Sequence, residues 1–551
     1  MGLTRPPWEK RAKVCASSLS GDLVMGKRKR CGRRKRAHLS RPRPSLLEQV
    51  ASVPPERLGI LAVDPAKDHC SVCLGNVRAK ILVPPFDVAY RKSALEGLVE
   101  TMRTACEDHG LQDLVVAIER TGSYYYPVRD VLKRHWKVLM VHPSVTKHLR
   151  QAVDPGNKTD ATDLYAAVHA AVVGYGRPEA ELPEPYAAGR LVSRERGSLV
   201  GHRAGFRVYI QERLHGILPG FARLFSGLWD SGVGRWLVRQ FPSAAALHAV
   251  GFEGLRARLR EAGHVPREKT LAKVLQWAAD APETTPHAAL RHGLLCTQFG
   301  LLERVESAIL DLERPLAGFL VQTPCVLLLS ARGIAAVSAA DYAAELGPIE
   351  DYATPKQITG RAGLYPSRYQ SSETDRRDGP LVTRRNARLR DALIQIAHDL
   401  LLCNPFIQAW AERRVKDKGW GTKQTYVAVA NKFARISFAM LHERRLFCHP
   451  LLGGPDAILR KLLAFAKAHA LPPEATRDLL RRAATYLPHD GLLHEARTLN
   501  ECLPRRRPRR GGPPERLGDI LRGLVADLVA RLPHDQQRSF GPLDNLGRAP
   551  S

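Results

Sequence analysis

Two carboxylates follow apolar runs in the first third of the chain. Residues 58–63 run into Asp64, and residues 114–118 run into Glu119. An apolar run that stops abruptly at an acid is typical of a buried strand with the acid at its tip. An acid after a strand is also a common turn residue, so either one alone decides nothing. Two such strand ends in chain order favour a shared site.

A further acidic pair, Asp160 and Asp163, is separated by three positions. This spacing places both carboxylates on one face at the start of a predicted helix. Both residues also suit the cap and first turn of a helix, and that interpretation stays open. If the pair joins Asp64 and Glu119 at the carboxyl edge of an α/β sheet, four carboxylates converge. Such a set suits Mg²⁺ or Mn²⁺, which take oxygen ligands together with water and substrate phosphate.

A loop rich in serine and arginine follows much later, in residues 363–390. A serine hydroxyl there could attack a phosphodiester, because neighbouring guanidinium groups would stabilise the charge that develops on phosphate. A basic loop that only binds phosphate or faces solvent is the alternative. The arginines that we expect to contact nucleic acid are Arg368, Arg376, Arg377, Arg384, Arg385 and Arg388.

Hydrophobic patterning predicts the elements that would position the acids. Strands are expected near residues 59–64, 69–76 and 77–83, then a helix at 93–109, a strand ending at Glu119, a helix from Tyr124, a strand at 138–142 and the acidic helix from Thr159. Three closely spaced strands predict a meander, and the later alternation of strands and helices adds parallel strands to the same sheet. This order is the layout of a ribonuclease-H-like nuclease.

The rest of the chain is predicted to be mainly helical. Residues 181–321 form a helical spacer with an apolar seam at Leu294, Phe299, Leu302, Val305, Ile309, Leu312 and Leu316. A seam of this spacing suits a coiled coil between subunits or packing within the chain, and both stay open. Residues 322–450 form a further domain that opens with a glycine turn between short helices. Residues 451–551 form a basic, partly disordered helical extension, and residues 1–56 form a basic disordered tail.

The overall charge points to nucleic acid as a partner. Lysine and arginine number 84 against 55 aspartate and glutamate, for a net charge of +29. A balance this basic is typical of proteins that bind DNA or RNA. We find no long uncharged apolar segment and no signal peptide, so we expect no membrane contact and a cytoplasmic, nucleoid-associated protein. Ten scattered cysteines suggest free thiols in a reducing compartment.

With these residues, the chain resembles the insertion-sequence transposases of the IS110 family, with their IS116 and IS902 relatives and the Piv-type DNA invertases. The resemblance covers residues 59–167 and 323–450. Its first part implies a RuvC-like nuclease domain, here residues 57–180, and its second part a C-terminal transposase domain. The four-acid DEDD site of the family falls on Asp64, Glu119, Asp160 and Asp163.

The resemblance also implies a serine nucleophile in a Pro…Ser-Gly loop of the transposase domain. That loop falls on the segment that begins at Pro366, where Ser371 is the best match, ahead of Ser372 and then Ser367. The sequence departs from the family pattern because Ser372 and Glu373 stand where glycines are usual. The register between Ser371 and Ser372 therefore stays open.

The mechanism that the resemblance implies is strand exchange through a covalent phosphoserine link, assisted by metal at the acids. It further implies a structured noncoding guide RNA that chooses the DNA sites. A homo-oligomer, dimer or tetramer, would build each site from the acidic domain of one subunit and the serine domain of another. Two alternatives remain: a Holliday-junction nuclease that uses metal-activated water without serine chemistry, and a nucleic-acid-binding scaffold that has lost catalysis.

Overall fold

The computed structural model describes residues 53–486, apart from 154, 179–181, 283–286, 372–373, 377–378, 384, 420 and 448–456. The predicted N-terminal tail lies almost entirely outside these residues, and so does most of the predicted C-terminal extension. The chain divides into two compact units, residues 1–180 and 181–551. The finer division into five segments stays a prediction.

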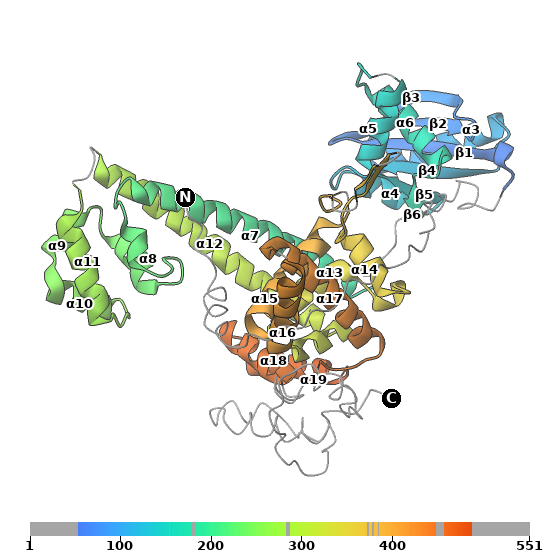
Figure 1. Ribbon diagram of the computed structural model, residues 1–551. Coiled ribbons are helices and arrows are strands. Elements are labelled where there is room, and N and C mark those ends of the chain that lie inside the picture. The colour runs from blue at the N-terminus through green and yellow to red at the C-terminus, as the bar shows by residue number, and fades with distance from the viewer. Residues whose placement is uncertain are drawn as a thin grey trace, which may run out of the picture. The chain divides into compact units, whose positions relative to one another are not determined.

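A six-stranded sheet with the order β3-β2-β1-β4-β5-β6 is the centre of the first unit (Figure 1). Its strands are β1 (Leu58–Pro65), β2 (His69–Asn76), β3 (Ile81–Ala89), β4 (Asp113–Glu119), β5 (Lys137–Val141) and β6 (Arg177–Pro178). The first three form an antiparallel meander, β4 and β5 run parallel to β1, and β6 is antiparallel to β5. The helices of this unit are η1 (Pro55–Arg57), α3 (Lys92–Asp108), α4 (Tyr126–Leu132), α5 (Pro143–Val153) and α6 (Asp160–Val172). The predicted mixed sheet with helices is confirmed.

Helices cover β1 on both faces, which explains its unbroken apolar sequence. Leu61 and Val63 pack in one cluster with residues of α3 and α4. Ile60 and Ala62 point the opposite way, into a second cluster with Leu164 of α6. Because successive side chains of a strand alternate between faces, only a doubly covered strand needs apolar residues at every position.

This unit differs from the prediction in two places. The third strand begins at Ile81 rather than at residue 77, because the side chain of Asn76 accepts hydrogen bonds from the backbone N–H groups of Arg78 and Lys80 and closes a turn there. The helix α5 was not predicted at all. It starts with Pro143, which suits the first position of a helix because proline has no N–H to leave unsatisfied.

The second unit is mainly helical, as predicted. Its spacer region holds α7 (Tyr186–His215), η2 (Phe221–Leu224), α8 (Gly232–Gln240), α9 (Ala244–Ala249), α10 (Gly251–Glu261), α11 (Glu268–Asp280) and α12 (Ala288–Leu320). The remainder holds η3 (Pro324–Ser330), α13 (Ala336–Leu346), η4 (Ile349–Asp351), α14 (Pro355–Ala362), β7 (Tyr369–Ser371), β8 (Thr374–Arg376), α15 (Ala387–Cys403), α16 (Pro405–Lys418), α17 (Thr422–His442), α18 (Ala457–Ala468) and α19 (Pro473–Ala484).

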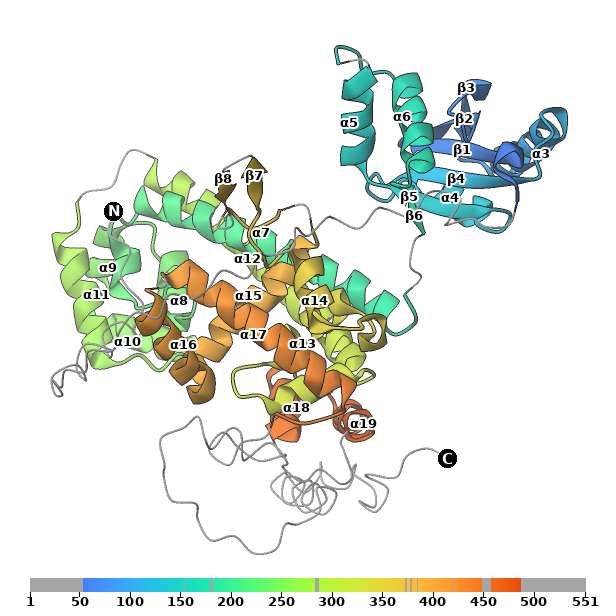
Figure 2. The ribbon, with the colours of Figure 1, turned by 45° about the vertical axis from the view of Figure 1, so that its right-hand side comes forward.

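The long helices α7 and α12 lie side by side, with the small bundle α8–α11 at one end (Figures 1 and 2). Phe299 and Leu302 of the predicted seam are buried in the core of that bundle, together with Leu214 of α7. Leu294, also placed in the seam, is 48% exposed, and its neighbour Leu295 is buried instead. The seam therefore packs largely within the chain.

A buried ion network joins this helical pair to the rest of the unit. Arg196 of α7 contacts Glu313 of α12 at 2.7 Å and Asp341 of α13 at 2.9 Å. The ring of His469, which follows α18, contacts Glu313 at 2.8 Å. Arg196 thus serves two carboxylates at this junction, and removing it would leave two largely buried charges without compensation.

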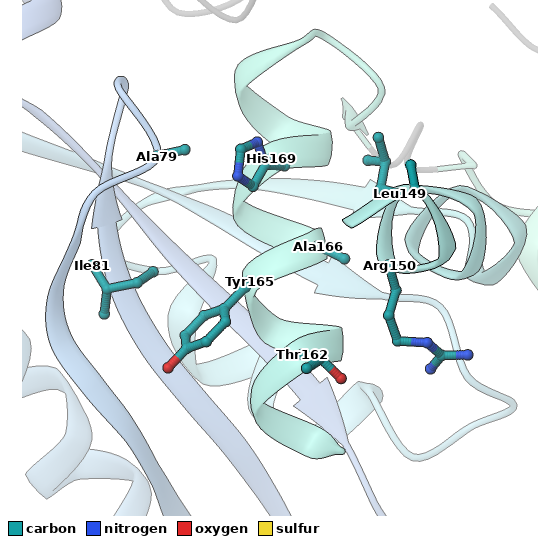
Figure 3. Close-up of a pocket in the computed structure, with 9 residues that line it drawn as sticks. Ala79, Ile81, Leu149, Arg150, Thr162, Tyr165, Ala166 and His169 are labelled. Carbon is teal, nitrogen blue, oxygen red and sulfur yellow. The ribbon is translucent and has the colours of Figure 1, made fainter. Parts of the chain in front are cut away.

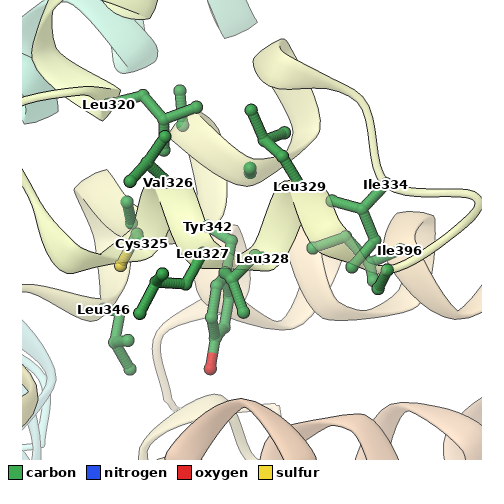
Figure 4. Packing of buried hydrophobic residues seen from close by; sticks show 14 of the residues in the cluster. Leu320, Cys325, Val326, Leu327, Leu328, Leu329, Ile334, Tyr342, Leu346 and Ile396 are labelled. Atoms are coloured by element: carbon green, nitrogen blue, oxygen red, sulfur yellow. The ribbon is translucent and has the colours of Figure 1, made fainter. Parts of the chain in front are cut away.

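The largest core of the chain surrounds η3 (Figure 4). Leu327, Leu328 and Leu329 are fully buried there and pack with Tyr342 of α13, whose hydroxyl lies 2.8 Å from Ser437 Oγ. The predicted glycine turn between two short helices is present as the link between η3 and α13. In the part of the chain that the structure describes, no single helix is long and apolar enough to cross a membrane. Only α12 and η3 taken together, across a bend of 106°, reach that length and composition.

Candidate functional site

The predicted acids come together at one edge of the first unit's sheet. β1 and β4 are parallel neighbours with Val63 opposite Ile118, so Asp64 and Glu119 follow at adjacent strand ends. α6, which begins at Asp160, packs against β1. The fold thus brings the two strand ends and the helix start into one neighbourhood.

The negative charges of the other three acids affect the ionisation of Asp64. The pKa of Asp64 is raised from 3.8 to about 6, first by burial and then by the negative charges of Glu119, Asp163 and Asp160, while Lys158 acts in the opposite direction. Burial away from water and nearby like charge both disfavour the ionised form of a carboxyl group. Carboxyl groups with a raised pKa gather at functional sites more often than elsewhere.

In this structure the four acids do not lie close enough together to coordinate one metal ion. Among the described residues, no three acidic, histidine or cysteine side chains lie close enough to hold a metal ion. This agrees with the electrostatics, because charges interact over many ångströms whereas Mg²⁺ needs oxygen ligands at about 2.0–2.1 Å. The carboxylate oxygens of the four acids are nevertheless the ligand type that a divalent ion prefers, and their side chains would have to come closer together to bind one.

The capping interpretation of Asp160 is wrong. Thr159 is the N-cap of α6, and its side chain accepts a hydrogen bond from the backbone N–H of Thr162. The Thr162 side chain in turn accepts from the backbone N–H of Thr159, which completes a capping box. The carboxylate of Asp160 is therefore not used to cap the helix.

The unpredicted helix α5 supplies two contacts to the acids. The hydroxyl of Thr146 donates to Glu119 Oε2 at 2.5 Å. The guanidinium of Arg150 donates to Asp163 Oδ1, also at 2.5 Å, and both side chains are almost buried. Neither residue was singled out from the sequence, because the contacts bridge residues 27 and 13 positions apart.

A cavity of about 280 Å³ is lined by residues of α5, α6 and the region before β3 (Figure 3). Tyr165 of α6, Ile81 of β3 and Leu149 of α5 contribute to its mainly apolar wall. Arg150 lines it as well, so the cavity and the acids share one side chain. Its volume is slightly below the range of about 300–1,000 Å³ that small-molecule pockets occupy.

The predicted serine lies in the second unit, on a short β-hairpin. Ser371 is the last residue of β7, pairs with Thr374 of β8 and is exposed. Ser372 lies outside the described residues. Ser367 is placed differently, because its backbone N–H donates to Pro380 O at 2.8 Å at the base of the loop. Among the described residues, no hydrogen-bond partner holds the Ser371 hydroxyl.

The predicted arginines have different environments. Arg368 makes two hydrogen bonds to Asp375, at 2.7 and 3.0 Å, which join the two arms of the hairpin. Arg388 donates to the backbone carbonyl of Arg194, while Arg385 donates to the hydroxyl of Tyr365. Arg376 is exposed at the end of β8. Arg377 and Arg384 lie outside the described residues.

Two family models match the chain. Residues 61–219 match a DEDD transposase model of the IS110 group, and this segment contains all four acids. Residues 325–411 match the transposase IS116/IS110/IS902 family, and this segment contains Ser371 and the predicted arginines. No curated protein matches the chain. Together, the two matches show that the chain belongs to the IS110 family of transposases and is an enzyme of DNA transposition.

Proposed function

We propose that this transposase cuts and rejoins DNA through the hydroxyl of Ser371, with a divalent ion held by Asp64, Glu119, Asp160 and Asp163. The observation that carries the proposal is the convergence of the acids around Asp64, whose pKa is raised first by burial and then by the charges of the other three. The matched order of the acidic segment and the serine segment supports the second half.

The acids would bind Mg²⁺ or Mn²⁺ through carboxylate oxygens. When bound, such an ion supplies charge neutralisation at phosphate and lowers the pKa of a coordinated oxygen. The role of the protein is to hold the carboxylates at one place: strand ends fix Asp64 and Glu119, and the first turn of α6 fixes Asp163. Asp64 must lose its proton before it can act as a ligand.

The serine would act as the nucleophile toward DNA. Its Oγ would form a bond to phosphorus, the hydroxyl proton would pass to a base, and the sugar oxygen of the cleaved bond would leave. The new strand end would later displace Ser371, so that the number of phosphodiester bonds is conserved. The acids that assist this serine would belong to another subunit of a homo-oligomer, either a dimer or a tetramer.

Guidance by a structured noncoding RNA is part of the same proposal. The net charge of +29 far exceeds what solubility needs and suits a protein that binds RNA and DNA together in the nucleoid. The RNA would be encoded beside the gene. Purified protein should then bind that transcript with an affinity that an unrelated RNA of equal length does not match at physiological salt.

The experiment that tests the chemistry is denaturing gel detection of protein-linked DNA. Wild-type protein with Mg²⁺, its RNA and target DNA should give a covalent adduct, and Ser371→Ala should give none. DNA that is cut in the presence of metal without any adduct would support the nuclease alternative. Tight binding that leaves the DNA intact would support the inactive scaffold.

A further inference from the structure

We propose that α5 is a positioning helix for the acid site, in which Thr146 holds Glu119 and Arg150 holds Asp163. This inference rests on the proposed function, in which the acids bind a divalent ion. It adds two residues that neither touch the ion nor react.

The two contacts come from one face of α5. Thr146 and Arg150 are four residues apart, a spacing that aligns side chains along a helix. Thr146 is 2% exposed, and its hydroxyl donates to Glu119 Oε2 at 2.5 Å. The side chains of Arg150 and Asp163, which form the ion pair, are also mostly buried, with exposures of 12% and 11%. One helix face therefore contacts two of the four acids.

Among the three neighbouring acids, Glu119 and Asp163 have the strongest repulsion with Asp64. After burial, Glu119 and then Asp163 contribute most to the raised pKa of Asp64, ahead of Asp160. Like charges at close range push apart when no cation is bound. The hydroxyl and the guanidinium oppose that repulsion. Thr146 contacts Glu119 through Oε2 and Arg150 contacts Asp163 through Oδ1, while Glu119 Oε1 accepts a longer hydrogen bond, of 3.4 Å, from the hydroxyl of Thr121.

Arg150 could also act in the opposite sense, as a built-in cation that competes with the metal for Asp163. The two roles predict opposite effects of neutralising the arginine. Without its charge the site is more negative, so a competitor or a simple counter-charge predicts tighter metal binding. A positioning residue predicts weaker binding, because outer contacts that orient metal ligands typically contribute about 10–100-fold in affinity.

The test measures Mn²⁺ binding to the full-length protein by calorimetry and by electron paramagnetic resonance. Arg150→Gln and Thr146→Val should each weaken binding about 10–100-fold. Arg150→Lys, which keeps the charge but loses the planar donor geometry, should fall between wild type and Arg150→Gln. Arg103→Gln is the matched control, because Arg103 forms an exposed pair with Glu100 on α3, and it should bind as wild type does.

A double variant separates positioning from general damage. In an Asp163→Asn background, adding Arg150→Gln should cost no further affinity, because the residue that Arg150 positions is already altered. Binding by Arg150→Gln that is unchanged or tighter than wild type would overturn the proposal. If Arg150→Gln does not fold, Thr146→Val decides, since it removes a hydroxyl and strands no charge: weaker binding supports the proposal and unchanged binding overturns it. Wild-type binding that survives Asp64→Asn would instead overturn the four-acid site itself.

Discussion

The raised pKa of Asp64 predicts how divalent-ion binding depends on pH. The carboxyl group ionises at about pH 6 in the folded chain rather than at 3.8, so below pH 6 the ion must displace a proton. With a pKa of about 6, the group is about 10% protonated at pH 7 and about 90% protonated at pH 5. Affinity for Mn²⁺ should therefore fall about tenfold between these two pH values. An acid with the ordinary value of 3.8 would cause almost no change over the same range.

Calorimetry of Mn²⁺ binding at pH 5, 6 and 7, repeated in buffers with different heats of ionisation, measures both the affinity and the protons released. Wild-type protein should release close to one proton per ion at pH 5 and almost none at pH 7. Asp64→Asn has no proton to lose at this position, so its weaker binding should show a flatter dependence. A wild-type affinity that is constant from pH 7 to pH 5 would refute the account of the acids as a coupled cluster.

Three further outcomes are expected. On a denaturing gel, Ser371→Ala should abolish the covalent DNA adduct while Ser372→Ala only slows its formation; the reverse pattern would move the nucleophile by one residue. Deleting residues 1–56 should flatten the dependence of nucleic-acid affinity on salt without abolishing recombination, and loss of all activity in a folded variant would contradict an accessory tail. In α7, Gly189→Ala should lower the free energy of unfolding by about 1–3 kcal/mol, because the new methyl group would lie 2.5 Å from a buried ring of α12. Gly201→Ala in the same helix meets nothing within 4 Å, so denaturant unfolding should show it as stable as wild type or more stable.

The sequence predicted the acid-bearing strands because their signal is local. β1 and β4 are fully covered strands, so each is an unbroken apolar run that stops at its acid. The start of α6 was equally local, although the cap proved to be Thr159 rather than Asp160. Parallel pairing of β1 with β4 followed from the alternation of strands and helices between them.

The contacts that hold the acids could not be predicted from spacing. α5 itself had a local signal that the prediction missed, because its apolar residues Val145, Leu149 and Ala152 follow a helical spacing. Thr146 reaches an acid on β4, and Arg150 reaches an acid on the following helix α6. Such contacts depend on how α5 packs against the sheet, which no local pattern encodes.

The acid site and the serine of the proposed mechanism are supported by very different amounts of structure. The acids lie on covered strands and on a capped helix, and two of them are held by α5. Ser371 lies near the tip of a hairpin with three residues in each strand, which the ion pair of Arg368 with Asp375 helps to hold together. A short hairpin of this kind is marginally stable without a partner surface. We therefore expect the acid site to be ordered before DNA arrives and the serine to gain its working position only on the assembled complex. That order would protect DNA from covalent attack away from the chosen sites.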